Sequence, residues 1–272
     1  MTDDADNPVL ELGVGETPLW PSVCITVLFD GDTPWRSLLG KLSLVPSVDR
    51  PQQVGFRKFK QRQWERLCLD RFKLMQFDHG LWIVPGNQSV PADADYVLRL
   101  DPGLAFGTSS HSTTRMCLQW IAQHDFNGQC VLDYGCGSGV LSIAAAIMGA
   151  AQVIYVGNDP QALTATADNA QRNQVGNIIR TLAVEEFTPP AADVVLANIL
   201  AGPLVELAPV LLASLRPGGA LVLAGILAEQ ANEVETAYHA QTDGMSVSED
   251  TGWVCLHGQK QAASVSLERD CQ

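Results

Sequence analysis

The chain has 272 residues, of which 46% are hydrophobic and 17% charged, and its formal net charge is −13. This composition is typical of a globular protein with room for one large domain and a small one. No apolar run approaches the roughly 18–20 residues of a membrane span. The negative charge argues against a nucleic-acid backbone as the main partner and suits a basic protein partner.

The N-terminus and the cysteines indicate the cellular compartment. The first residues, MTDDADN, are acidic and lack the apolar segment of a secretory signal. The seven cysteines are scattered and include no CxxC pair, so the sequence indicates neither a disulfide framework nor a zinc site. We therefore expect a cytoplasmic protein with reduced thiols.

The first part of the chain contains few predicted elements. Residues 23–30 alternate as a strand does, and residues 35–44 have helical spacing of apolar side chains. This is too little for a core of its own. Residues 61–72 predict a helix, which either connects two domains or lies on the surface of the large one. The pieces LWIV and DYVLRL that follow look like strands leading to the large domain.

Residues 100–123 begin as a turn-rich segment and continue as a helix. Ser112 or Thr113 is a suitable N-cap for that helix. His111 could act as a base or a ligand, although a histidine at such a place more often hydrogen-bonds within its loop.

The segment VLDYGCGSGVL, residues 131–141, predicts a strand, a tight turn and a helix. Gly135, Gly137 and Gly139 occupy alternate positions in the turn. Glycines allow positive φ and close approach of a ligand, and a helix start offers free N–H groups. The G-x-G-x-G spacing differs from the G-x-G-x-x-G of dinucleotide enzymes. We interpret the loop as a cradle for S-adenosylmethionine rather than NAD.

Strands and helices alternate through the rest of the chain. A strand at residues 152–156 ends at Gly157, and Asp159 caps the next helix with Pro160 at its first position. Three more strands alternate with helices, and a final hairpin pairs MSVSED with WVCLHG. This predicts an α/β fold, a doubly wound, mostly parallel seven-stranded sheet from about residue 90 onward. Ligands bind at the carboxyl ends of such strands, where Gly135, Gly157 and Asn198 fall. The further predicted strands are residues 179–184, 193–200 and 220–227, and the helices are residues 200–219 and 229–241.

Five segments in one order carry a family resemblance: LDPGLAFGTSSHSTT, VLDYGCGSGVLSIAA, DPQALTATADNAQRN, ANILAGPLVELAP and GILAEQANEVETAY. With them the chain resembles the PrmA family from about Asp6 to Lys260. Those enzymes use S-adenosylmethionine to methylate amino groups, on lysine side chains and the N-terminal amine, of the eleventh protein of the large ribosomal subunit. The resemblance implies a monomer whose partner is that basic protein.

The resemblance also implies a domain organisation. Residues 73–272 would form a class I, Rossmann-like methyltransferase domain, and residues 61–72 would form a linker helix. Residues 1–60 would form a small α+β ferredoxin-like domain that docks on the ribosomal protein. That small domain would be truncated, because the match begins partway into it, and we expect a start codon assigned too far downstream.

The resemblance assigns the site residue by residue. Asn198 would be catalytic, because its amide can orient the incoming nitrogen. The alternatives are that Asn198 merely opens the next helix and that Thr114 caps its own. No metal is expected. The implied cofactor contacts are Thr114, Gly135, Gly137, Gly157 and Asn198.

The chain departs from the family pattern at two places in this region. Ser109, Ser110 and Ser112 replace glycine, threonine and proline, with a mild expected effect. The family's strand end reads VDIDP where this chain reads VGNDP, so Gly157 stands where a carboxylate would hold the ribose hydroxyls. We expect cofactor affinity to be lower by roughly ten- to a hundredfold. Asn158 or a water could partly substitute, whereas Asp159 is assigned to the helix cap.

Two other functions stay open at this point. The chain could be a non-catalytic homologue that keeps the fold, having lost the ribose carboxylate. It could also be a methyltransferase of the same fold with a small-molecule or RNA acceptor, although the predicted linker helix and the acidic charge disfavour that reading.

Overall fold

The computed structural model describes Thr2–Asp3, Val23–Cys24 and residues 74–86, 88–100, 111–135 and 137–262. The chain divides into two compact units, Met1–Cys68 and Leu69–Gln272. In the first unit, β1 (Thr2–Asp3) pairs antiparallel with β2 (Val23–Cys24). The other predictions for residues 1–72, including both helices, lie outside the described residues.

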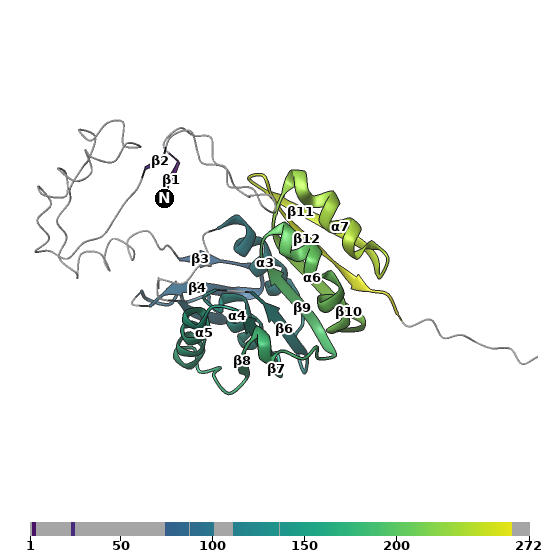
Figure 1. The fold of residues 1–272 in the computed structure, drawn as a ribbon. Helices are drawn as coiled ribbons and strands as arrows, with labels where there is room; N and C mark the ends of the chain where they lie inside the picture. The colour runs from purple at the N-terminus through teal and green to yellow at the C-terminus, as the bar shows by residue number, and fades with distance from the viewer. Residues whose placement is uncertain are drawn as a thin grey trace, which may run out of the picture. The chain divides into compact units, whose positions relative to one another are not determined.

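A seven-stranded sheet forms the centre of the second unit (Figure 1), in the order β11-β12-β10-β9-β6-β7-β8. The central pairs are parallel, whereas β12 runs antiparallel to both β10 and β11. The predicted mostly parallel sheet and its final hairpin are therefore confirmed. The strands are β6 (Cys130–Tyr134), β7 (Gln152–Gly157), β8 (Ile179–Ala183), β9 (Ala192–Asn198), β10 (Leu215–Leu227), β11 (Thr242–Asp250) and β12 (Trp253–Lys260).

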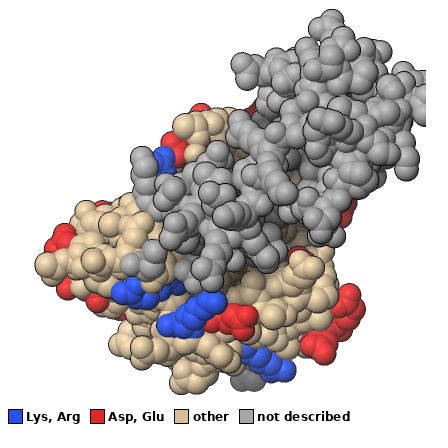
Figure 2. Space-filling view, turned by 90° about the vertical axis from the view of Figure 1, so that its left-hand side faces the viewer, with Lys and Arg blue, Asp and Glu red and all other residues tan. Residues whose placement is uncertain are grey.

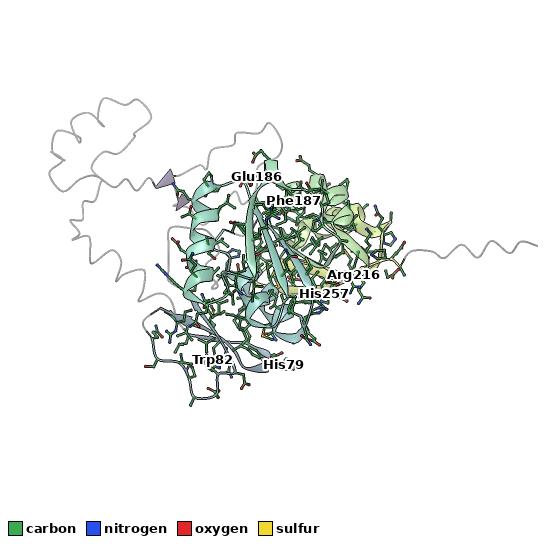
Figure 3. All side chains as sticks on the ribbon, turned by 90° about the horizontal axis from the view of Figure 1, so that it is seen from below. His79, Trp82, Glu186, Phe187, Arg216 and His257 are labelled. Atoms are coloured by element: carbon green, nitrogen blue, oxygen red, sulfur yellow. The ribbon has the colours of Figure 1, made fainter. Side chains whose placement is uncertain are left out.

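The strands predicted at LWIV and DYVLRL belong to a second, three-stranded sheet, so the large sheet begins at β6 and not near residue 90. This small sheet contains β3 (Met75–Gln76), β4 (Leu81–Pro85) and β5 (Tyr96–Leu100), with the 3-10 turn η2 (Asp78–Gly80) before β4. Figure 3 shows Trp82 of this sheet well apart from His257 of the large one.

Asn173 ties the small sheet to the large domain. Its side-chain oxygen accepts from the Arg99 N–H at 2.7 Å, and its Nδ2 donates to the Arg99 carbonyl at 2.7 Å. One asparagine thus satisfies both backbone groups of an edge residue of β5, which anchors the strand to the end of the helix that follows β7.

Helices cover both faces of the large sheet and create two cores. On one face, α3, α4, α5 and the small sheet bury side chains such as Leu118, Ile143 and Leu98. On the other, α6 and α7 bury Leu204, Leu211 and Tyr238 (Figure 1). Sheets buried on both faces read as nearly continuous apolar runs, which is why β9 and β10 were recognisable. The helices are α3 (Ser112–Gln123), α4 (Val140–Ile147), α5 (Pro160–Arg172), α6 (Ala201–Ala213) and α7 (Ala231–His239), with 3-10 turns η3 (Val184–Glu186) and η4 (Ala228–Gln230).

The largest error in the predicted boundaries concerns the end of one helix. The helix expected at residues 200–219 ends at Ala213, and the RPGG segment belongs to the start of β10. Gly218 has φ +74°, which is incompatible with helix continuation. None of the described helices is both long and apolar enough to cross a membrane.

Candidate functional site

The carboxyl ends of the central strands gather the predicted site residues along one edge of the sheet. The N–H of Gly135, after β6, donates to the carbonyl of Val156 in β7 at 2.8 Å. Asn198 ends β9, where it pairs with Ala224 of β10. The Asn198 amide donates from Nδ2 to the Thr114 hydroxyl of α3 at 3.2 Å. Residues from β6, β7, β9, β10 and α3 therefore lie at the edge where a doubly wound sheet binds its ligand.

The glycine loop after β6 needs glycine for two separate reasons. Gly135 and Gly139 have φ of +87° and +75°, in the region that side chains avoid. A Cβ on Gly135 would collide with Ile199, and one on Gly139 would lie 2.5 Å from Thr166. The loop therefore follows a path that brings its backbone close to Ile199 and Thr166 of neighbouring elements.

Two polar contacts hold this loop in place. Asp133, fully buried at the end of β6, accepts from the backbone N–H of Ser142 at 2.9 Å and from its hydroxyl at 2.6 Å. Asn169 of α5 donates to the carbonyl of Ser138 at 3.0 Å. Charge-assisted and buried bonds of this kind are costly to break. The loop is thus preorganised by the first turn of α4 and by α5.

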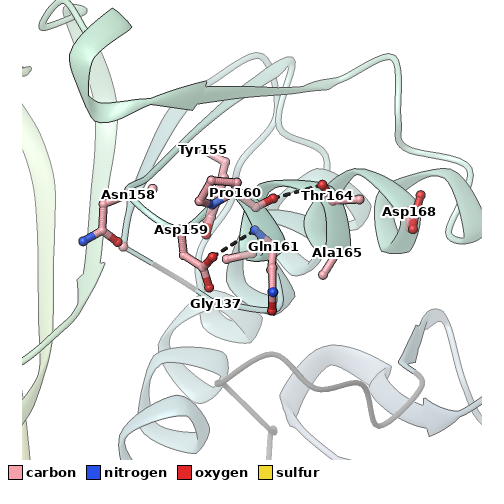
Figure 4. A pocket seen from close by; sticks show the side chains of 12 residues that line it. Gly137, Tyr155, Asn158, Asp159, Pro160, Gln161, Thr164, Ala165 and Asp168 are labelled. Carbon is pink, nitrogen blue, oxygen red and sulfur yellow. Dashed lines mark hydrogen bonds between the residues drawn. The ribbon is translucent and has the colours of Figure 1, made fainter.

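A cavity of about 650 Å³ opens beside the loop (Figure 4). Its size falls in the range of small-molecule sites. Asp159 caps α5 by accepting from the Gln161 N–H at 2.9 Å, as predicted, and Thr164 donates to the Pro160 carbonyl. The cavity is lined by Gly135, Gly137, Tyr155, Gly157, Asn158, Asp159, Pro160, Gln161, Ala162, Thr164, Ala165 and Asp168.

The lining includes Tyr155, which sequence reasoning missed. Tyr155 is 1% exposed, and its hydroxyl lies 3.0 Å from the position that a Cβ on Gly157 would take. The signal was present in the strand itself: residues 155 and 157 alternate onto the same face of the sheet. A large polar-tipped side chain there faces the same space as the residue expected to hold the ribose.

Thr114 and Asn198 form a second group that does not line the cavity. Their contact is adjacent to the loop, because Ile199 packs where a Gly135 side chain would be. Gly225 of β10 has φ +89° and lies against the Ile199 backbone, at the β-bulge between Ala224 and Ile226. The bulge thus lets the chain after Asn198 fit closely between β10 and the glycine loop.

His111 caps α3 and is not among the residues that line the cavity. Its Nδ1 accepts from the Thr113 N–H at 3.4 Å, and its ring meets Trp253 edge-on at 5.0 Å. The prediction of Ser112 or Thr113 as the cap is therefore wrong. Ser112 instead hydrogen-bonds Thr251 at 2.7 Å. The structure favours the loop hydrogen-bonding role for His111.

Two of the residues that line the cavity are acidic. Asp159 and Asp168 contribute carboxylates, which suit a cationic ligand. Burial raises the pKa of Tyr134, at the end of β6. Figure 2 shows one face of the molecule, on which basic side chains lie among acidic ones.

Comparison with known sequences decides the family. Residues 1–261 match the family described as ribosomal protein L11 methyltransferase (PrmA). The chain belongs to this family. A relative of that name from Pseudomonas aeruginosa is 44% identical over 261 residues, covering 96% of this chain and 88% of the relative. One from Azotobacter vinelandii is 44% identical over 257 residues.

A solved structure supports the assignment. The ribosomal protein L11 methylase of Lactobacillus delbrueckii subsp. bulgaricus superposes with a TM-score of 0.61 and is 29% identical. The match covers 69% of this chain and 98% of that one. The PrmA resemblance and the class I methyltransferase fold expected from the sequence are thus confirmed.

Proposed function

We propose that this chain transfers methyl groups from S-adenosylmethionine to amino groups of ribosomal protein L11, on lysine side chains and the N-terminal amine. Family membership supports the reaction and the protein substrate. The observation that carries the site is the convergence of the glycine loop, the 650 Å³ cavity and the Thr114–Asn198 pair at one sheet edge.

The cavity fits the cofactor on structural grounds. Gly135 and Gly137 of the glycine loop line the cavity, and the lining carboxylates of Asp159 and Asp168 complement a cation. When bound, S-adenosylmethionine supplies a methyl group on a sulfonium, an activated leaving group. Gly135, Gly137 and Gly157 would hold the cofactor at the cavity, with Thr114 and Asn198 at its reactive side.

Positioning is the task left to the protein. The bound cofactor would supply its methyl group to an uncharged amine, whose proton would leave to solvent. Since Nδ2 of Asn198 donates to Thr114, its side-chain carbonyl is the group that can accept from the incoming amine. Holding the nitrogen in line contributes the larger part of such a rate.

Residues 1–60 are proposed as the docking domain for L11, and residues 61–72 as the linker helix. The net charge of −13 favours encounter with a basic protein and should make association sensitive to salt. A cytoplasmic monomer, with no nucleic acid as its main partner, fits this role.

The test is a methylation assay with the full chain, purified L11 and S-adenosylmethionine, read by peptide mass spectrometry. We expect methyl groups on lysine side chains and on the N-terminal amine. Asn198→Ala should lower kcat on the order of a hundredfold, with a smaller loss of S-adenosylhomocysteine affinity. Cofactor binding without any methylation of L11 would favour a non-catalytic homologue or another acceptor.

A further inference from the structure

Tyr155 and Gly157 form a coupled pair at the end of β7. A Cβ on Gly157 would lie 3.0 Å from the Tyr155 hydroxyl and 3.2 and 3.3 Å from two ring carbons. These separations are shorter than ordinary van der Waals contact. Because Tyr155 is only 1% exposed, its ring has little room to shift. The tyrosine therefore occupies part of the space that a side chain at residue 157 would use.

The ring runs along the strand toward the carboxyl edge of the sheet. Tyr155 belongs to the core formed with α4 and α5, so its body is anchored by apolar contacts, and it nevertheless lines the cavity together with Gly157. An anchored aromatic ring with a polar tip costs little conformational entropy on binding a ligand, since its rotamer is already fixed.

The other polar neighbours are less suited to the same position. Asp159 turns its carboxylate toward the Gln161 N–H, at the N-terminus of α5. Asn158 is exposed, and Figure 4 shows its amide pointing away from Gln161 and Thr164. A phenol hydroxyl both donates and accepts hydrogen bonds, which matches the two hydroxyls of a ribose.

We propose that the Tyr155 hydroxyl binds the ribose of S-adenosylmethionine in place of the carboxylate that Gly157 lacks. The proposal rests on the proposed function, which places this cofactor in the cavity. It revises the expected effect of Gly157, because a neutral hydroxyl recovers part of the interaction that a charged acceptor would provide.

The first test is Tyr155→Phe, which removes the hydroxyl and keeps the ring. Calorimetric titration of the full chain with S-adenosylhomocysteine should show affinity lower by roughly two- to tenfold, the range of one neutral hydrogen bond. Tyr238→Phe is the matched control: its buried hydroxyl donates to the Leu204 carbonyl at 2.7 Å, away from the cavity. It should lose stability and keep the parent's affinity.

A ribose-modified probe separates contact from structural disturbance. The 2′-deoxy and 3′-deoxy analogues of S-adenosylhomocysteine each lack one hydroxyl. For at least one analogue, parent and Tyr155→Phe should bind equally, because the contact is already missing. A tyrosine with only a structural role would give the same loss with all three ligands, which would overturn the proposal.

The reciprocal test is Gly157→Asp. The carboxylate must displace the Tyr155 ring, so we expect affinity no higher than the parent's. A tenfold or greater gain in cofactor affinity would show that an aspartate side chain fits beside Tyr155. That result would contradict the proposal that Tyr155 takes the place of the carboxylate. Equal binding of S-adenosylhomocysteine by the parent and Tyr155→Phe would also defeat it, whereas no binding by the parent would defeat the proposed function itself.

Discussion

The ends of β6 and β7 lie side by side and contribute to the same cavity, yet they constrain their residues differently. After β6, Gly135 is required by its own backbone, at φ +87°, and by Ile199 beside it. At the end of β7, Gly157 has no left-handed backbone, and a side chain at this position would be crowded by Tyr155. The first strand end is determined by backbone stereochemistry. The second depends on a pair of residues, Tyr155 and Gly157, that can change together.

Gly135→Ala tests the backbone requirement and should give the largest effect. We expect a loss of at least about 2 kcal/mol in unfolding free energy, from the left-handed φ and the collision with Ile199, together with loss of S-adenosylhomocysteine binding. Gly128→Ala is the control, since φ there is +74° with no atom within 4 Å of the added Cβ. In denaturant unfolding, the free energy of unfolding of Gly135→Ala should be well below that of Gly128→Ala. Equal losses in the two variants would show that the contact with Ile199 adds no cost.

Asp133→Ala tests whether the loop is held by its buried carboxylate. Removing the acceptor of the Ser142 N–H and hydroxyl should cost about 1.5–3 kcal/mol and weaken cofactor binding. Asp193→Ala is matched, because Asp193 accepts from the Cys130 N–H at 2.7 Å at the opposite end of β6. If both variants weakened S-adenosylhomocysteine binding equally, the loop would not be specifically held by Asp133.

Asp159→Ala distinguishes a helix cap from a ligand contact at the end of β7. Loss of the cap should cost about 1 kcal/mol in stability, while affinity for S-adenosylhomocysteine stays within about twofold of the parent. A tenfold fall in affinity, measured by calorimetry, would make Asp159 the ribose partner and remove the need for Tyr155.

The smallest expected effect is a pH dependence of stability that comes from His257. This residue lies on β12, away from the ends of β6 and β7. Burial lowers its pKa, so the unfolded chain binds a proton more readily. Stability should fall as pH drops below about 6.5, the ordinary histidine value, and level off below the folded pKa. In thermal unfolding between pH 5 and 8, His257→Gln should show a weaker pH dependence than His239→Gln. The reverse order would contradict the effect of burial.

The large sheet and the glycine loop could be predicted because their signals are local. Apolar strands, alternate glycines and Asp159 before Pro160 each specify a nearby conformation. The small sheet was missed as a separate layer because β4 and β5 pair with each other, and strand pairing is a long-range property. The RPGG segment was assigned to a helix although Gly218 adopts a positive φ.

In the candidate site, too, positions set by local signals could be predicted, whereas long-range side-chain contacts could not. Gly135, Gly157 and Asn198 could be placed at strand ends from periodicity alone. The Thr114–Asn198 hydrogen bond and the crowding of Gly157 by Tyr155 depend on which side chains lean toward each other, which spacing does not reveal. Likewise, His111 as the cap of α3 could not be separated from Ser112 or Thr113 by sequence, because all three can accept from a helix N–H.

The measurement that tests the account most directly is calorimetric titration of the purified full chain with S-adenosylmethionine. The account predicts saturable binding at one site per chain, weakened severalfold by Tyr155→Phe and lost in Gly135→Ala. Binding that is absent from the parent, or unchanged in Gly135→Ala, would show that this sheet edge is not the cofactor site.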